Sequence, residues 1–266
     1  MSVAGLGPFA DRVMVAGGDG FAHGVSPDGV ARSNRGQRAI VPAGGLGYGA
    51  GMTDLYAPPD VPLSLIHHDA QIVVVDKPAG LLSVPGKGED KADCLIERLR
   101  GVFPEILLVH RLDRDTSGVM VFALTRAAQA ALGQQFEKRQ TKKVYVARLE
   151  GRLEPREGRV DLPLCVDWPN RPRQHVDHVN GRPAQTDWRV VKYLPNETRV
   201  RLMPVTGRSH QLRVHMAETG HPILGDALYA AGAAREHPRL MLHAESLRVR
   251  HPDTGKSLTY SAPCPF

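Results

Sequence analysis

The chain has 266 residues and a formal net charge of +6, which suits one large globular domain, or one domain with an appendage, and favours polyanionic partners. The three cysteines, Cys94, Cys165 and Cys264, form no C-x-x-C pair, which argues against a disulfide framework or a zinc site and indicates a reducing compartment. No secretory signal is visible and no apolar run approaches the roughly 20 residues that span a bilayer, so we expect a cytoplasmic protein without a membrane segment.

The first 51 residues differ in composition from the rest of the chain. They hold almost half of its 27 glycines and show no sustained period of 2 or 3.6 residues. Aperiodic, Gly-rich sequence buries too little apolar surface to offset the entropy lost on ordering. We therefore predict a disordered N-terminal extension over residues 1–58, with Met52 as a candidate true start, and a folded domain over residues 59–266.

The folded part begins with short elements. Gln71–Asp76 is a β-branched run that predicts a strand, and Asp93–Arg100 predicts a short helix with apolar residues on one face. Val119–Leu124 predicts a buried strand. Thr125 then predicts the N-cap of a helix that runs from Arg126 to about residue 138.

Strands dominate the remainder of the chain. One further helix is predicted over Ser209–Glu218, with Ser209 as a candidate cap and Gly220 as its end. The predicted strands are Lys143–Leu149, Thr186–Tyr193, Thr198–Pro204, Leu240–Val249 and Ser257–Ser261, with a hairpin turn over Leu194–Glu197. Because strands outnumber helices and no βαβ rhythm is present, we predict an α+β fold with a mixed, mostly antiparallel sheet flanked by helices.

The densest polar segment is His110–Gly118, just before a predicted buried strand. It contains two acids, two arginines, a histidine and two hydroxyl groups, which are costly to place near a core unless they are paired. One interpretation is a solvated loop with a structural ion pair. The other is a functional cleft in which arginines hold one carboxylate.

Two further segments combine charge with a predicted element. In Thr206–His215, Arg208 and Arg213 could reach a phosphate or a buried carboxylate, although the segment also fits an ordinary amphipathic helix. In Lys142–Ala147, Lys143 and Tyr145 share one face of a strand, where the tyrosine could stack on a base or simply pack in the core. His210 and His215 are five positions apart, so they do not converge on a metal ion.

Together these segments resemble the RluA family of pseudouridine synthases. His110–Gly118 matches the family motif H-R-L-D-x-x-T-S-G at every fixed position, and it is followed by K-x-Y-x-A at Lys143–Ala147. The later matches are Gly207–His215, which fits G-R-x-H-Q-[IL]-R-x-H, then His221–Asp226 and Tyr229, and two stretches, Lys77–Gly86 and Leu162–Pro172, that resemble one branch of the family in particular. The resemblance runs from about residue 60 to the end, with no S4-like RNA-binding module ahead of the catalytic domain.

This resemblance implies an enzyme that isomerises uridine in RNA to pseudouridine and needs neither a cofactor nor a metal. It implies that Asp113 is the catalytic carboxylate, as a nucleophile or a base, that Arg213 pairs with it, and that Tyr145 stacks on the target base. Arg111 matches a residue that enters the RNA stack where the uridine has left. The other candidate RNA-binding residues are His110, Arg114, Lys143, Arg208 and His210.

The same branch of the family implies two substrates, 23S rRNA and the anticodon stem-loop of tRNA, and we expect a monomer. Two other functions stay open. The chain could be an RNA chaperone or assembly factor that binds RNA without chemistry, although binding a polyanion gains nothing from a buried acid. It could also be a hydrolase, resembling a glycosidase or a nuclease, that uses Asp113 together with Asp115.

Overall fold

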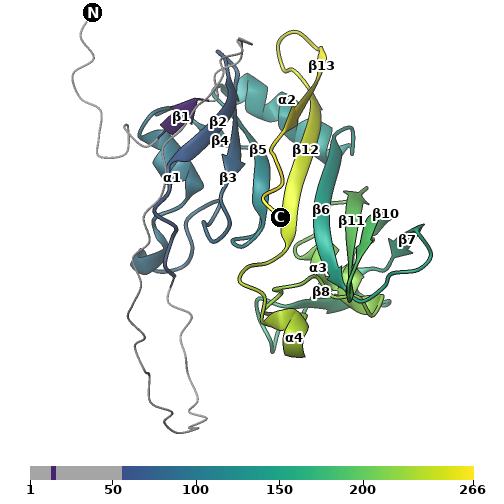
Figure 1. Ribbon diagram of the computed structural model, residues 1–266. Helices are drawn as coiled ribbons and strands as arrows, with labels where there is room; N and C mark the ends of the chain where they lie inside the picture. The colour runs from purple at the N-terminus through teal and green to yellow at the C-terminus, as the bar shows by residue number, and fades with distance from the viewer. Residues whose placement is uncertain (1–12, 16–55) are drawn as a thin grey trace, which may run out of the picture. The chain divides into compact units, whose positions relative to one another are not determined.

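The computed structural model describes residues 13–15 and 56–266 of the chain (Figure 1). The strands of its main sheet are β1 (Val13–Val15), β2 (Leu63–His68), β3 (Ile72–Lys77), β4 (Leu107–Leu108), β5 (Ser117–Ala123), β6 (Lys142–Glu150), β7 (Glu157–Asp161), β10 (Gln185–Leu194), β11 (Glu197–Pro204), β12 (Leu242–Arg250) and β13 (Ser257–Ser261). A separate two-stranded hairpin consists of β8 (Leu164–Val166) and β9 (Gln174–Val176). The helices are α1 (Leu95–Arg100), α2 (Arg126–Glu137), α3 (Gln211–Glu218), α4 (Gly232–Arg235) and the 3-10 turn η2 (Glu89–Lys91).

The main sheet is mixed and mostly antiparallel, which confirms the predicted fold class. Its strands follow the order β1-β2-β3-β5-β12-β6-β11-β10-β7, with β4 paired to β5 and β13 paired to β12. Among the described residues, the parallel pairings are β1 with β2 and β5 with β12. The β5–β12 pairing covers two residue pairs, so a short junction joins the two halves of the sheet.

Alternation along β3 and β5 explains why helices cover both faces of the first half. Val73 and Val75 pack with α1, whereas Ile72 and Val74 on the opposite face pack with α2. The apolar run of β5 is buried throughout, as expected for a strand covered on both faces. Figure 1 shows α2 lying behind β5 and β12.

The second half of the sheet has its own hydrophobic cluster. Leu212 and Met216 of α3 pack against Val200 and Leu202 of β11. Tyr145 of β6 packs against this cluster and also against the α1 cluster. The place where the two clusters meet is therefore on β6, and this is where the polar segments converge.

Most predicted elements are confirmed with small shifts of their ends. Ser257–Ser261 forms a strand with those bounds, and Thr125 caps α2 by accepting a hydrogen bond from the Ala128 N–H at 3.1 Å. The predicted turn before Glu197 forms a hairpin, with Asn196 in the left-handed region at φ 58°. Gly220 follows the C-cap of α3 at φ 79°, as predicted.

Two predictions need correction. Ser209 does not cap α3, because the N-cap is His210, which has a left-handed φ of 52° and makes no side-chain cap hydrogen bond. Part of the N-terminal extension was wrongly predicted to lack structure, because Val13–Val15 forms a strand that pairs with β2. The rest of that extension, residues 1–12 and 16–55, lies outside the described residues.

In the part of the chain that is described, no helix is long and apolar enough to cross a membrane.

Candidate active site

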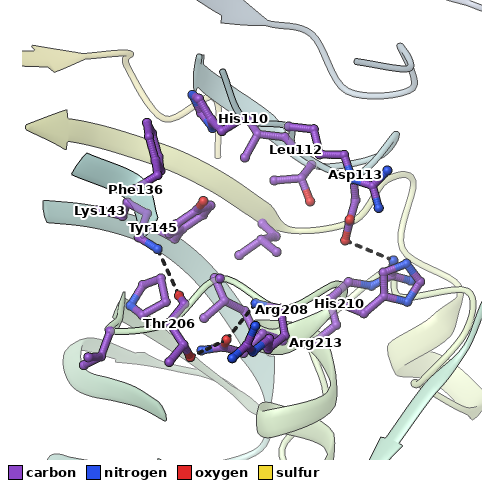
Figure 2. Close-up of a pocket in the computed structure, with 18 of the residues that line it drawn as sticks. His110, Leu112, Asp113, Phe136, Lys143, Tyr145, Thr206, Arg208, His210 and Arg213 are labelled. Carbon is purple, nitrogen blue, oxygen red and sulfur yellow. Dashed lines mark hydrogen bonds and ion pairs between the residues drawn. The ribbon is translucent and has the colours of Figure 1, made fainter. Parts of the chain in front are cut away.

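The converging polar segments line a cavity of about 480 Å³ (Figure 2). One wall is the loop before β5, the opposite wall is the end of β11 and the following loop with the start of α3, and β6 lies between them. All of the predicted site residues except Arg114 line this cavity: His110, Arg111, Asp113, Lys143, Tyr145, Arg208, His210 and Arg213.

Backbone contacts on both sides hold Asp113 at the cavity wall. The Ser83 hydroxyl donates to the Leu112 carbonyl at 2.6 Å and accepts from the Leu112 N–H at 3.2 Å. On the other side, the buried Lys77 ammonium donates to the Arg114 carbonyl at 2.8 Å and to two further carbonyls, those of Pro78 and Leu81. The loop is therefore fixed at both neighbours of Asp113, whose side chain remains 30% exposed.

Arg213 faces Asp113 but has a closer partner that the sequence did not reveal. Its Nη1 lies 3.6 Å from Asp113 Oδ2, whereas its Nε and Nη2 each donate to the Asp226 carboxylate at 2.7 Å. Asp226 is fully buried and also accepts the N–H groups of Leu228 and Tyr229. Burial lowers the pKa of Arg213, but the hydrogen bond and charge of Asp226 outweigh it and raise the pKa overall. Asp226 thus fixes the guanidinium, which presents its remaining nitrogen to Asp113.

Strand β6 contributes Tyr145 and Lys143 to the cavity, as the alternation predicts. Burial, together with the charge of Asp113, raises the pKa of Tyr145 well above its usual range, so its hydroxyl stays protonated. Lys143 donates to the Thr206 carbonyl at 2.9 Å, and burial lowers its pKa to about 8. Figure 2 shows Lys143 and Tyr145 on the side of the cavity opposite the Asp113–Arg213 pair.

His110 and Arg114 are held by protein contacts. The His110 ring stacks on Phe136 with centroids 4.6 Å apart, and its Nε2 accepts the Val121 N–H at 3.1 Å. Burial lowers the pKa of His110 to about 3, so it faces the cavity as a neutral ring and not as a phosphate-binding cation. Arg114 donates to both carboxylate oxygens of Asp115, at 2.9 and 3.1 Å, and lies outside the cavity lining.

A buried amide organises the loop that carries Arg208 and His210. Oε1 of Gln211 accepts from the Thr206 hydroxyl at 2.6 Å and from the Arg208 N–H at 3.0 Å. His210 then turns in the left-handed region and its Nδ1 lies 2.7 Å from the Tyr229 hydroxyl. These internal hydrogen bonds fix the loop that carries Arg208 and His210.

The arrangement can act on the sugar of a nucleoside. It combines a partly exposed carboxylate, a buried guanidinium that orients it, and a tyrosine ring that can stack on a planar base. Arg111 is exposed at the same cavity. Among the described residues, no group of three His, Cys, Asp or Glu side chains could hold a metal ion.

Comparison with known proteins agrees with this chemistry. A family model described as RNA pseudouridylate synthase matches residues 71–218. The dual-specificity RNA pseudouridine synthase RluA of Escherichia coli (strain K12) is 54% identical over 79% of this chain and 98% of its own length. The protein of the same name from Pasteurella multocida is 48% identical over the same shares. The solved structure of human RNA pseudouridylate synthase domain containing 1 is 30% identical, with a TM-score of 0.64 over 77% of this chain and 84% of that chain.

The family and the reaction follow together from the matched length and from the carboxylate-centred cavity. The chain belongs to the RNA pseudouridylate synthase family and is an isomerase that converts uridine in RNA to pseudouridine.

Proposed function

We propose that this enzyme has dual specificity, isomerising a uridine in a hairpin loop of 23S rRNA and one in the anticodon stem-loop of tRNA, and that it acts as a monomer. The similarity to relatives named for dual specificity supports this, because it extends over 98% of the Escherichia coli protein. RNA hairpin loops offer unstacked bases, whereas A-form helices hide them, so two different loops can present a uridine in the same way.

We propose Asp113 as the catalytic carboxylate. In the reaction the N1–C1′ bond of uridine breaks, a C5–C1′ bond forms, C5 loses its proton, and N1, which carries no proton in uridine, gains one. Asp113 serves this either as the nucleophile that attacks C1′ or as the base that removes a sugar proton. The observation that carries the assignment is the position of Asp113 in the cavity, 3.6 Å from the buried Arg213 guanidinium.

The other cavity residues divide into base-binding and phosphate-binding roles. Tyr145 would stack on the extruded uracil, and the neutral ring of His110 lines the same cavity. Lys143, Arg208 and His210 would contact the RNA backbone, and Arg111 would fill the gap that the extruded uridine leaves, because a planar guanidinium stacks and binds phosphate together. Arg114 is proposed as a weaker RNA contact, since Asp115 already binds it.

The test is Asp113→Asn in an assay of tritium release from RNA that carries [5-³H]uridine. We expect turnover to be abolished, while the melting temperature and the affinity for RNA remain close to those of the wild type. Asp115→Asn is the matched control, since Asp115 contacts Arg114 and does not line the cavity. Normal pseudouridine formation by the Asp113 variant would refute the assignment. Release of free uracil, or cut strands, would support a hydrolase instead.

Dual specificity needs a separate experiment. Pseudouridine mapping of tRNA and 23S rRNA in a deletion strain, with and without this protein restored, would reveal both targets. Loss and recovery of modification in both RNAs is the expected result, and modification of one RNA alone would restrict the proposal to that substrate.

A further inference from the structure

The hairpin β8–β9 is seated beside the cavity by contacts from both of its strands. From β9, the Gln174 N–H donates to the Tyr229 hydroxyl at 2.8 Å, and the same hydroxyl lies 2.7 Å from His210 Nδ1. On the β8 side, the backbones of Leu164 and Arg182 exchange N–H to carbonyl hydrogen bonds. Arg208 Nε donates to the carbonyl of the adjacent Pro183 at 3.2 Å. His210 and Arg208 both line the cavity, so the hairpin is held at its edge.

The turn between these strands displays an aromatic ring to solvent. Trp168 is 66% exposed, whereas Trp188, the second tryptophan of the chain, is 9% exposed in the core. The guanidinium of Arg171 lies over the Trp168 ring, 3.4 Å from its centroid. One face of the ring is thus covered by a cation, and the ring as a whole remains largely open to solvent.

The fold of the turn does not require this ring. The Asp167 carboxylate accepts two hydrogen bonds from Asn170 Nδ2, both at 3.0 Å, and the Asp167 N–H donates to the Arg173 carbonyl at 3.0 Å. The turn is therefore closed by Asp167 and Asn170. Within its own turn the Trp168 ring lies against Arg171, and exposing the rest of the ring to water has a cost.

The charge around the ring suits an anion. The Asp167 carboxylate accepts its hydrogen bonds from Asn170 inside the turn, whereas the Arg171 guanidinium lies over the Trp168 ring. Arg173, two residues further on, lies 5.1 Å from the Tyr229 ring and donates to the Leu228 carbonyl, which places a second cation between the turn and the cavity. An aromatic face with adjacent arginines is the combination by which proteins bind single-stranded nucleic acid.

We propose that Trp168 and Arg171 form a second RNA contact, at which an unpaired base of the substrate loop, other than the target uridine, stacks on Trp168 while Arg171 binds its phosphate. This proposal rests on the proposed function, in which the substrate is a hairpin loop. Such a loop holds several unstacked bases, and the cavity takes one of them. The contact would add affinity and select loops whose second base reaches the turn.

The experiment uses the full chain and an anticodon stem-loop RNA, and compares Trp168→Ala, Trp168→Phe and Arg171→Ala. The matched control is Arg152→Ala, because Arg152 makes a similar contact over Tyr193, 3.8 Å from the ring centroid, away from the cavity lining. We expect Trp168→Ala to raise KM and the Kd for RNA about tenfold with much less change in kcat. Trp168→Phe should recover most of the affinity, and Arg171→Ala should weaken binding and reduce its salt dependence.

Tryptophan fluorescence gives an independent readout. RNA should quench the emission of the wild type, and the quenching should be lost in Trp168→Phe, in which the buried Trp188 is the remaining tryptophan. The proposal is overturned by unchanged KM and Kd in Trp168→Ala, or by an affinity loss that follows a lower melting temperature and is not recovered by phenylalanine. Failure of the proposed function would appear differently, as a wild type that binds the stem-loop and forms no pseudouridine in it.

Discussion

Arg213 and Asp226 form a buried ion pair beside Asp113, the proposed catalytic carboxylate. The Arg213 side chain is 6% exposed and the Asp226 side chain is not exposed. Taking both charges out of water is costly, and the cost is offset by a two-point contact and by two backbone N–H groups that also reach Asp226. The result is a guanidinium with one orientation, which is what a carboxylate nucleophile or base needs beside it.

Asp226→Asn tests this arrangement. The change leaves the buried Arg213 charge without its main partner, so we expect the free energy of unfolding to fall by about 3–5 kcal/mol and turnover to fall as well. Urea unfolding followed by circular dichroism measures the first effect and tritium release measures the second. Glu245→Gln removes a two-point partner of Arg201 at the surface and should cost at most about 1 kcal/mol. Equal losses in the two variants would contradict the assignment.

The lowered pKa of Lys143 predicts that RNA binding depends on pH. Its pKa is lowered to about 8, so the side chain is a cation below that pH and a neutral amine above it. RNA affinity should therefore decrease as the pH rises through about 8, because a positive charge is lost at the cavity. The measurement is Kd against pH at constant ionic strength, in the Asp113→Asn background so that no turnover occurs.

Lys143→Arg is the control for this titration. Arginine stays protonated throughout the range, so its affinity should be flat where that of lysine falls. A wild-type profile that matches the arginine variant would show that Lys143 does not carry the titration.

At the scale of elements, Gly118 connects the loop of Asp113, the proposed catalytic residue, to the centre of the sheet. It has a φ of 114° in β5 and pairs with Ala244 of β12 at the parallel junction. A Cβ at this position would lie 2.3 Å from the Ala244 carbonyl oxygen. The glycine at the end of the H-R-L-D-x-x-T-S-G motif is therefore required by a positive φ and by close backbone approach.

Gly118→Ala should separate β5 from β12 and displace the loop that carries Asp113. We expect a loss of at least about 1–3 kcal/mol in the free energy of unfolding, from backbone strain alone, together with reduced turnover. Gly133→Ala is the matched control, since Gly133 lies within α2 with no atom within 4 Å of the added Cβ. It should stabilise the protein by about 0.5–1 kcal/mol. Chemical denaturation compares the two variants, and a harmless Gly118→Ala would disprove the role of the junction.

The elements that the sequence predicted are those with a strong local signal. The capping residue Thr125 before a helical run, and the apolar run of β5, can each be predicted from the local sequence alone. The strands β7 and β8 were not predicted, because β7 buries only Val160 and β8 has three residues, so neither shows a clear period. The predicted N-cap of α3 was wrong because the loop is fixed by hydrogen bonds of the Gln211 side chain to distant segments, and not by a cap from Ser209.

At the scale of the whole molecule, the site is assembled from segments that are far apart in the chain. The resemblance supplied Asp113, Tyr145 and Arg213, and the structure brings all three to one cavity. Asp226 could not be assigned from the sequence, because it lies in a loop with no charge pattern of its own. Its signal was present in the matched segment His221–Asp226, but only three-dimensional proximity to Arg213 gives it a role.

The positions of the core and cavity residues along the chain predict which part of it is sufficient for activity. The main hydrophobic clusters and every cavity residue lie between residues 63 and 266. We therefore expect a chain that starts at Met52 to fold, and to release tritium from RNA at a rate within about twofold of the full chain. Removing β1 leaves the edge of β2 unpaired, so the melting temperature should fall slightly and self-association should increase. Thermal unfolding, light scattering and turnover of the two chains, measured side by side, test this, and an inactive or unfolded short chain would show that the first 51 residues contribute to the catalytic domain.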